Sequence, residues 1–221
     1  MVTATKGAVG QLACERRGDR PLSSQLAEST RELHRVAERT GFIAELLRGR
    51  ASRKAYLHYL SCLQPVYEAL ERGLERTDFV DLAARELRRS TAIAADLEVL
   101  GASWRPVVLP AARAYATRIS WLSRTHPARL AAHSYVRYMG DLSGGRVMRG
   151  LLEKTLLLQR SELAFHEFPE IPDPATFKNN YRGLLDRVGR SAERPSTILD
   201  EAQLAFRYNI ELSVAISDAV R

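Results

Sequence analysis

A helical pattern that contains three glycines runs through Ala132-His133-Ser134-Tyr135-Val136-Arg137-Tyr138-Met139-Gly140-Asp141-Leu142-Ser143-Gly144-Gly145-Arg146-Val147-Met148. Apolar side chains recur through it at helical spacing and continue beyond it, so one long helix is expected over residues 128–158. Gly140, Gly144 and Gly145 interrupt this helix. Each glycine in a helix interior costs about 1 kcal/mol relative to alanine, so the three together cost roughly 3 kcal/mol unless the missing side chains serve a purpose.

Two purposes are open for these glycines. Close packing of another helix on Gly140 and Gly144, or a kink at the Ser143-Gly144-Gly145 cluster, needs no ligand. Alternatively, a flat ligand lies directly on the helix backbone, because residues without a Cβ atom permit such an approach. Asp141 favours the ligand, since a carboxylate beside this bare patch is costly to bury without a partner.

The run from Tyr135 to Gly145, YVRYMGDLSGG, closely resembles the signature of the haem oxygenases. In that family the glycine-rich helix lies over the distal face of the haem. The resemblance implies that Asp141 holds an ordered water on that face. It also implies that haem is contacted by Tyr135, Gly140, Ser143, Gly144 and Gly145.

A second candidate, His34, lies on the apolar stripe of a helix expected to run from a serine cap at Ser23 or Ser24 to Gly41. A lone histidine there is more often a core residue than a ligand. Glu38 favours the ligand, because one turn later its carboxylate can accept the Nδ1 proton and leave Nε2 free to bind a metal. Residues 28–38 also resemble the haem oxygenase proximal helix, which implies that His34 binds the iron and Glu38 orients it.

One position departs from the family pattern. Ala27 stands where many members carry a lysine that reaches toward a haem propionate. The resemblance then implies a modestly weakened or reoriented haem, unless Arg31 or the basic N-terminal residues supply the missing cation.

The mouth of a haem site needs cations, because haem carries two propionates. Lys178 and Arg182 are four residues apart and project from one face of a helix expected from Thr176 to about Val188. An ordinary exposed basic face is the competing interpretation. Residues 177–182 resemble the family's propionate-binding helix and follow an AFxxFP-like segment at 164–169. This likeness implies oxidation at the α position and cofactor contacts for Lys178, Tyr181, Arg182 and, on the last helix, Phe206.

The proposed role of Asp141 needs a hydrogen-bonded network that keeps its carboxylate ionised and its water ordered. The family builds such a network from two tyrosines, an arginine and an asparagine. The matching residues, which come from four separate predicted helices, are Tyr67, Tyr115, Arg137 and Asn209. Taken singly, each is more simply explained by core packing or by a surface amide.

His133 is the rival iron ligand beside the motif. It lies two helical turns, roughly 12 Å, from Asp141 along the axis, so a structural hydrogen bond is expected instead.

The remaining helices are expected at 52–76 with a kink at Pro65, at 79–99, at 111–124 and at 196–219, with an irregular crossover at 161–175. No alternating strand pattern is present in the sequence. The expected architecture is a single all-α domain of many helices at 21–221, with haem between a proximal and a glycine-kinked distal helix. Residues 1–20 are expected to form a flexible basic extension.

Composition excludes several classes of protein. With 45% hydrophobic and 27% charged residues, the 221-residue chain is typical of a soluble globular protein and has no apolar run long enough to span a membrane. The polar C terminus resembles that of bacterial haem oxygenases, which lack the membrane tail of the animal ones. The two cysteines, Cys14 and Cys62, form neither a disulfide framework nor a metal motif, which favours a cytoplasmic setting.

The resemblance implies a haem oxygenase that converts haem, with O₂ and electrons, to biliverdin, Fe²⁺ and CO, the biliverdin being the IXα isomer. Haem b is then both substrate and cofactor. Electrons must come from a separate ferredoxin or flavoprotein reductase, because no phosphate-binding loop for flavin or nicotinamide is present. A haem carrier or sensor that does not degrade haem is the alternative. The net charge of +7 also suits a DNA-binding regulator, but the basic residues are scattered among glutamates, which argues against nucleic acid as a partner.

Overall fold

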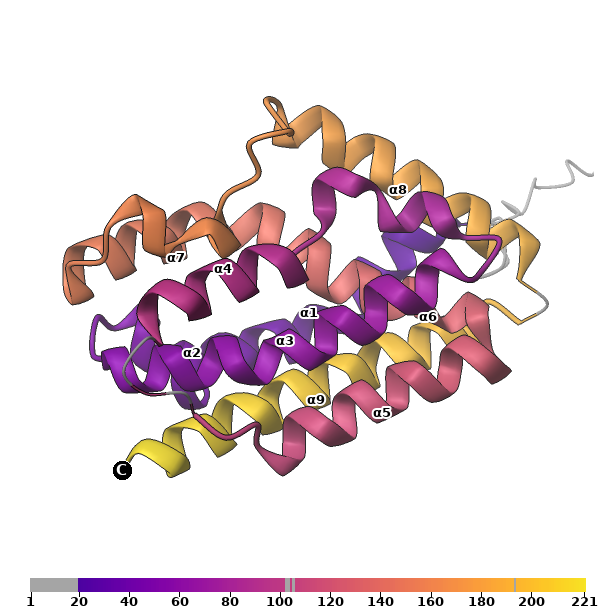
Figure 1. Cartoon of the computed structure of the whole chain (residues 1–221). Helices are drawn as coiled ribbons and strands as arrows, with labels where there is room; N and C mark the ends of the chain where they lie inside the picture. Colours follow the sequence, from indigo (N-terminus) through magenta and orange to yellow (C-terminus); the bar gives the residue numbers. More distant parts are fainter. Residues whose placement is uncertain (1–19, 102–103, 105, 193) are drawn as a thin grey trace, which may run out of the picture.

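A computed structural model describes residues 20–101, 104, 106–192 and 194–221. The extension expected at residues 1–20 lies outside the described part except for Arg20. The described residues are helical without a strand, which confirms the all-α prediction (Figure 1). The α-helices are α1 (Leu22–Glu38), α2 (Gly41–Leu47), α3 (Arg53–Glu75), α4 (Ser90–Leu100), α5 (Pro110–Thr125), α6 (Leu130–Ser134), α7 (Gly140–Leu156), α8 (Pro174–Ser191) and α9 (Ser196–Val220).

Helix α3 runs through the centre of the molecule and packs against α5, α4 and α9 (Figure 1). Ser52 caps it as expected, because its Oγ accepts the Ala55 N–H at 3.1 Å. Pro65 lies inside α3, which continues past it. Most of the α3 side chains are buried, and each fully buried leucine or tyrosine contributes about 1.5–3 kcal/mol of hydrophobic stabilisation.

The predicted ends of α1 are wrong at both sides. The helix begins at Leu22, where the Pro21 carbonyl accepts the N–H groups of Ser24 and Gln25 at 3.1 and 3.2 Å, so no serine side chain caps it. It ends at Glu38, and Gly41 instead begins the unpredicted helix α2. Gly41 has φ +58° and approaches α9 so closely that a Cβ atom would lie 2.4 Å from the Ser213 carbonyl carbon.

The single helix expected at 79–99 is also wrong. Residues 80–87 form two short 3₁₀ turns, and α4 begins only at Ser90. The cause is tertiary, because the Glu71 carboxylate on α3 accepts the N–H groups of Arg89 and Ser90 at 2.7 and 3.0 Å and so sets the start of α4.

The long helix expected at 128–158 is divided by a π-helical turn at Tyr135–Met139, which joins α6 to α7. The irregularity therefore precedes Gly140, and α7 continues as an α-helix through Ser143-Gly144-Gly145. A π turn holds one more residue than an α turn, which lets the site side chains leave the helix at a different angle.

The crossover before α8 is irregular as predicted, with 3₁₀ turns at Arg160–Glu162 and Ala164–His166. Helix α8 begins at Pro174, because Asp173 accepts the N–H groups of Ala175 and Thr176 at 2.9 and 3.3 Å. Helix α9 forms as expected and packs on α1, α2 and α6.

Candidate functional site

A cavity of about 270 Å³ lies where α1 faces the π turn and α9. It joins residues that are far apart in the sequence, since α1 contributes His34, the π turn Tyr135 and α9 Phe206. The remaining lining residues, all on α1, are Ala27, Thr30, Arg31 and Arg35.

His34 is the candidate metal ligand of this cavity. Its Nδ1 atom lies 3.5 Å from Glu38 Oε1, and its side chain is 57% exposed, so Nε2 is accessible. The ring contacts Phe206 edge-on, with centroids 5.9 Å apart. Among the described residues no three histidine, cysteine or acidic side chains gather into a metal site. A single exposed imidazole therefore suits a metal that brings its own ligands, as haem iron does.

The missing side chains of Gly140 and Gly144 face open space. A Cβ atom built on either glycine would meet no atom of the described residues within 4 Å. Close helix packing therefore does not explain these two glycines, and a cradle for a flat ligand does. Gly145 differs, because its Cβ would lie 3.5 Å from the carbonyl oxygen of His166. The structure turns Gly145 toward the crossover segment and away from the open face.

The predicted network is assembled around Asp141. The Tyr67 hydroxyl on α3 donates a short hydrogen bond to Asp141 Oδ2. Arg137 in the π turn donates to that hydroxyl from Nη2 at 2.8 Å and from Nε at 3.0 Å, while its Nη2 lies 3.5 Å from Asp141 Oδ1. On the other side Arg137 Nη1 donates to Asn209 Oδ1 on α9 at 2.7 Å. Burial raises the pKa of Tyr115 on α5, and Arg137 and Asn209 act in the opposite direction.

Burial raises the pKa of Asp141 above its usual range, while the Arg137 charge, the Tyr67 hydrogen bond and the Arg89 charge act in the opposite direction. Burial alone would lower the pKa of Arg137, but Tyr67 and Asp141 raise it well above its ordinary value, so Arg137 stays charged. Asp141 is only 13% exposed, and the effect of burial on its pKa exceeds the opposing effects of Arg137, Tyr67 and Arg89.

Two members of the network were missing from the sequence-based prediction. Tyr59 is buried on α3, and Arg137 lowers its pKa against the rise that burial causes. Tyr59 and Tyr67 are eight residues apart and lie on one face of α3. This spacing was the sequence signal that could have predicted that Tyr59 belongs to the network. Arg89 carries no such signal, because only the tertiary fold brings it near Asp141.

The predicted cations at the mouth lie beside α7 and the π turn. Lys178 Nζ donates to Ser143 Oγ at 3.3 Å, and Arg182 Nη1 donates to Asn179 Oδ1 at 2.7 Å. Burial raises the pKa of Tyr135, and the Arg182 charge opposes this rise, which places Arg182 near the cavity. Tyr181 is not brought to the cavity with them, since its ring is buried in the core and its hydroxyl donates to the Leu82 carbonyl at 3.1 Å.

Ala27 lies in the cavity wall together with Arg31, one turn along α1. Arg31 makes no hydrogen bond or ion pair with any of the described residues. Its guanidinium is therefore available for an anionic group at the mouth.

His133 makes structural hydrogen bonds, as expected. It is fully buried, with Nε2 3.0 Å from Glu201 Oε1 and Nδ1 3.4 Å from the Tyr115 hydroxyl. Arg118 also binds Glu201, with Nε 3.0 Å from Oε1. Despite burial, the hydrogen bonds from His133 and Arg118 lower the pKa of Glu201 to about 2.

Comparisons with known proteins agree with this geometry. The family model described as Heme oxygenase matches residues 20–215. The chain is 35% identical to Heme oxygenase 1 of Rattus norvegicus over 201 residues, which cover 86% of this chain and 70% of the relative. It is 34% identical to Heme oxygenase 1 of Synechocystis over 198 residues, which cover 86% and 82% of the two chains.

Solved structures give the same result. The heme oxygenase of Leptospira interrogans superimposes with a TM-score of 0.82 at 34% identity, covering 89% of this chain and all of that one. Heme oxygenase-1 of Synechocystis in complex with heme gives a TM-score of 0.82 at 31% identity, covering 91% and 94% of the two chains. In the part of the chain that the structure describes, none of the helices combines the length and apolar character needed to cross a membrane.

Proposed function

The chain belongs to the haem oxygenase family and is an enzyme that degrades haem, and we propose that it opens the macrocycle to biliverdin, expected to be the IXα isomer, with release of Fe²⁺ and CO. O₂ is the oxidant, and electrons come from a separate ferredoxin or flavoprotein reductase. Residues 21–221 form the catalytic domain, and the enzyme acts in the cytoplasm.

The observation that carries this proposal is the position of Asp141 beside the open face of Gly140 and Gly144. The Asp141 carboxylate is buried and contacts Tyr67 and Arg137. It lies beside the one stretch of α7 where glycines on two successive turns leave the backbone open to space. A carrier needs the bare backbone but has no use for the carboxylate network.

On the proximal side, His34 binds the iron through Nε2 while Glu38 accepts the proton of Nδ1. This hydrogen bond fixes the tautomer and the direction of the ring. Phe206 packs edge-on against His34 and limits its rotation. Haem, once bound, supplies both the redox-active iron and the macrocycle that is oxidised.

On the distal side, Asp141 accepts hydrogen bonds and holds a water over the open glycine face. Tyr67 donates to Asp141, and Arg137 donates to Tyr67, so every donor in this row points toward the carboxylate. Asn209 and Tyr115 hold Arg137 from behind. This polarity keeps Asp141 an acceptor, which orients the water with one hydrogen toward Asp141 and frees its other hydrogen for the reacting group.

At the mouth, Lys178 and Arg182 bind the propionates and select which edge of the macrocycle faces Asp141. Arg31 adds the cation that Ala27 does not supply, since its guanidinium lies in the cavity wall without a protein partner among the described residues. Tyr135 and Ser143 complete the rim on the side of the π turn and α7.

An optical titration tests the proposal. One equivalent of haemin is added to the purified protein under air, the Soret band is recorded, and electrons are then supplied by ascorbate or by a ferredoxin system. A histidine-type haem spectrum that converts to biliverdin absorption supports the proposal. A complex that stays unchanged, or haem that bleaches without biliverdin, refutes it.

The Asp141→Ala variant separates an oxygenase from a carrier. Both should bind haemin, since Asp141 does not line the proximal cavity. An oxygenase should lose biliverdin formation in this variant, whereas a carrier should be unaffected.

A further inference from the structure

Arg89 is a buried cation near Asp141 that takes no direct part in the hydrogen bonds of the Asp141 network. It precedes α4, is 5% exposed, and has its backbone N–H held by Glu71 Oε1 at 2.7 Å. Its guanidinium lies over the ring of Phe168, 4.0 Å from the centroid. Arg89 is therefore held both at its backbone N–H and at the plane of its guanidinium.

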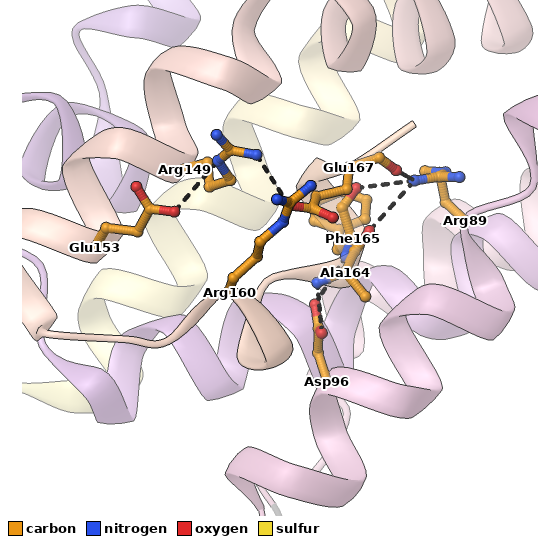
Figure 2. A network of polar contacts seen from close by, with 8 residues as sticks. All are labelled: Arg89, Asp96, Arg149, Glu153, Arg160, Ala164, Phe165 and Glu167. Carbon is orange, nitrogen blue, oxygen red and sulfur yellow. Dashed lines mark hydrogen bonds and ion pairs between the residues drawn. The ribbon is translucent and has the colours of Figure 1, made fainter. Parts of the chain in front are cut away.

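The guanidinium donates only to backbone carbonyl groups. Nη1 donates to the Phe165 carbonyl at 3.2 Å and, more closely, to that of Glu167 (Figure 2). Nε donates to the Leu87 carbonyl at 3.3 Å. No carboxylate among the described residues forms an ion pair with Arg89. A buried charge without a counter-ion is costly, so this position needs an explanation.

Three of the carbonyl groups bound by Arg89, those of Ala164, Phe165 and Glu167, belong to a segment that α4 holds from a second point. Asp96, fully buried on α4, accepts the N–H of Ala164 at 2.8 Å and that of Phe165 at 2.9 Å (Figure 2). Arg89 and Asp96 thus form a clamp on residues 164–167, one binding carbonyl groups and the other binding amides.

This clamped segment contacts the site directly. The Phe165 ring meets the Tyr67 ring edge-on at 5.7 Å, and the His166 carbonyl lies 3.5 Å from the Cβ position of Gly145 on α7. Because the Tyr67 hydroxyl donates to Asp141, a displacement of Phe165 would move the Tyr67 ring and change its hydrogen bond to the carboxylate.

Arg89 also acts on Asp141 through space. Asp141 affects the pKa of Arg89 more than any other charged group does, and Arg89 in turn lowers the pKa of Asp141. No hydrogen bond joins the two side chains. The other titratable or charged groups that interact with Asp141, or that line with it an adjacent cavity of about 170 Å³, are Tyr59, Tyr67, Tyr115, Arg137, Tyr138, Arg146, Arg149, Arg160, His166 and Glu167.

We propose that Arg89 is a positioning residue for haem degradation, a second buried cation near Asp141 that fixes the distal wall through the carbonyl groups of residues 164–167. The inference rests on the proposed function of Asp141. It assigns two separable tasks to one side chain, a charge and a clamp.

Three variants separate these tasks. Arg89→Gln removes the charge and most of the clamp. Arg89→Lys keeps the charge but loses the planar fork, and it also serves if the glutamine variant does not fold. Asp96→Asn loosens the clamp at its other end and leaves the charge of Arg89 in place.

The first readout is the pH dependence of biliverdin formation. The acid limb should move upward by about one pH unit in Arg89→Gln and should stay near the wild-type position in Arg89→Lys and Asp96→Asn. Burial raises the pKa of Asp96 to about 6, so the clamp itself titrates in this range. An acid limb that disappears in Asp96→Asn, or one that does not move in Arg89→Gln, overturns the inference.

The second readout needs no turnover. The ¹³C resonance of the Asp141 carboxyl group, assigned by its loss in Asp141→Asn, is titrated in the protein without haem. Its midpoint should rise by about one unit in Arg89→Gln only, while amide exchange at Phe165 should accelerate in all three variants. If the wild-type protein forms no biliverdin, the proposed function fails, and this titration still decides whether Arg89 acts on Asp141.

Discussion

Adding one methyl group at Gly144 should stabilise the protein and impair its function at the same time. Gly144 lies inside α7, and its Cβ position meets no atom of the described residues within 4 Å. Alanine is favoured over glycine in a helix interior by about 1 kcal/mol, and nothing in the structure opposes the new methyl group. Gly144→Ala should therefore raise the free energy of unfolding by roughly 0.5–1 kcal/mol, or Tm by about 1–4 °C.

Haem binding should change in the opposite direction. If the ring lies on the backbone of α7, the new Cβ atom occupies the space that the ring needs, and haem must shift or tilt. A tenfold loss of affinity, about 1.4 kcal/mol, is the smallest effect expected. Urea unfolding without haem measures the first quantity, and a haemin titration of the Soret band measures the second.

Gly150→Ala is the matched control. Gly150 lies on the same helix and its Cβ position is equally open, but it stands six residues beyond Gly144, roughly 9 Å further from Asp141 along the helix axis. It should show the same stabilisation with unchanged haem affinity. The reasoning is refuted if Gly144→Ala and Gly150→Ala bind haem equally well, because the bare backbone would then have no ligand to admit.

Three further predictions concern the polar residues. His34→Ala should lose the histidine-type haem spectrum, and added imidazole should restore it, because the ligand is exposed at the cavity surface; a retained spectrum would assign the ligand elsewhere. Tyr67→Phe removes a hydrogen bond that lowers the pKa of Asp141, so the acid limb of biliverdin formation should move to higher pH; an unchanged pH profile would contradict this role. Glu201→Gln breaks a buried pair and should cost about 3 kcal/mol in urea unfolding near neutral pH. Since the folded-state pKa of Glu201 is lowered to about 2, its contribution is present above pH 4.5 and is lost as the pH falls toward 2, so variant and wild type should converge there.

The local pattern was sufficient for several parts of the molecule. Helix α3 follows from one apolar face and a serine cap, and both persist in the folded chain. The pairing of His34 with Glu38 follows from their spacing on one helix, because residues four apart share a face whatever the rest of the chain does.

Other features could not be predicted because their cause lies in distant residues. Helix α4 begins at Ser90 because Glu71 binds the backbone there, and no local signal marks that residue. Gly145 resembles Gly144 in the sequence, yet it packs against His166, while Tyr181 turns its hydroxyl to Leu82 and away from the propionate-binding face.

The sequence by itself determined most of the long helices, which residue types could bind haem, and that Asp141 needs partners. These properties depend on periodicity and on spacing within one helix, which a linear chain records directly. Only the tertiary structure decided where the helix breaks before Gly140, which glycines face open space, and that Arg89 stands near Asp141. Those outcomes depend on the packing of separate helices and on the electrostatics of a shared interior, and neither exists until the chain has folded.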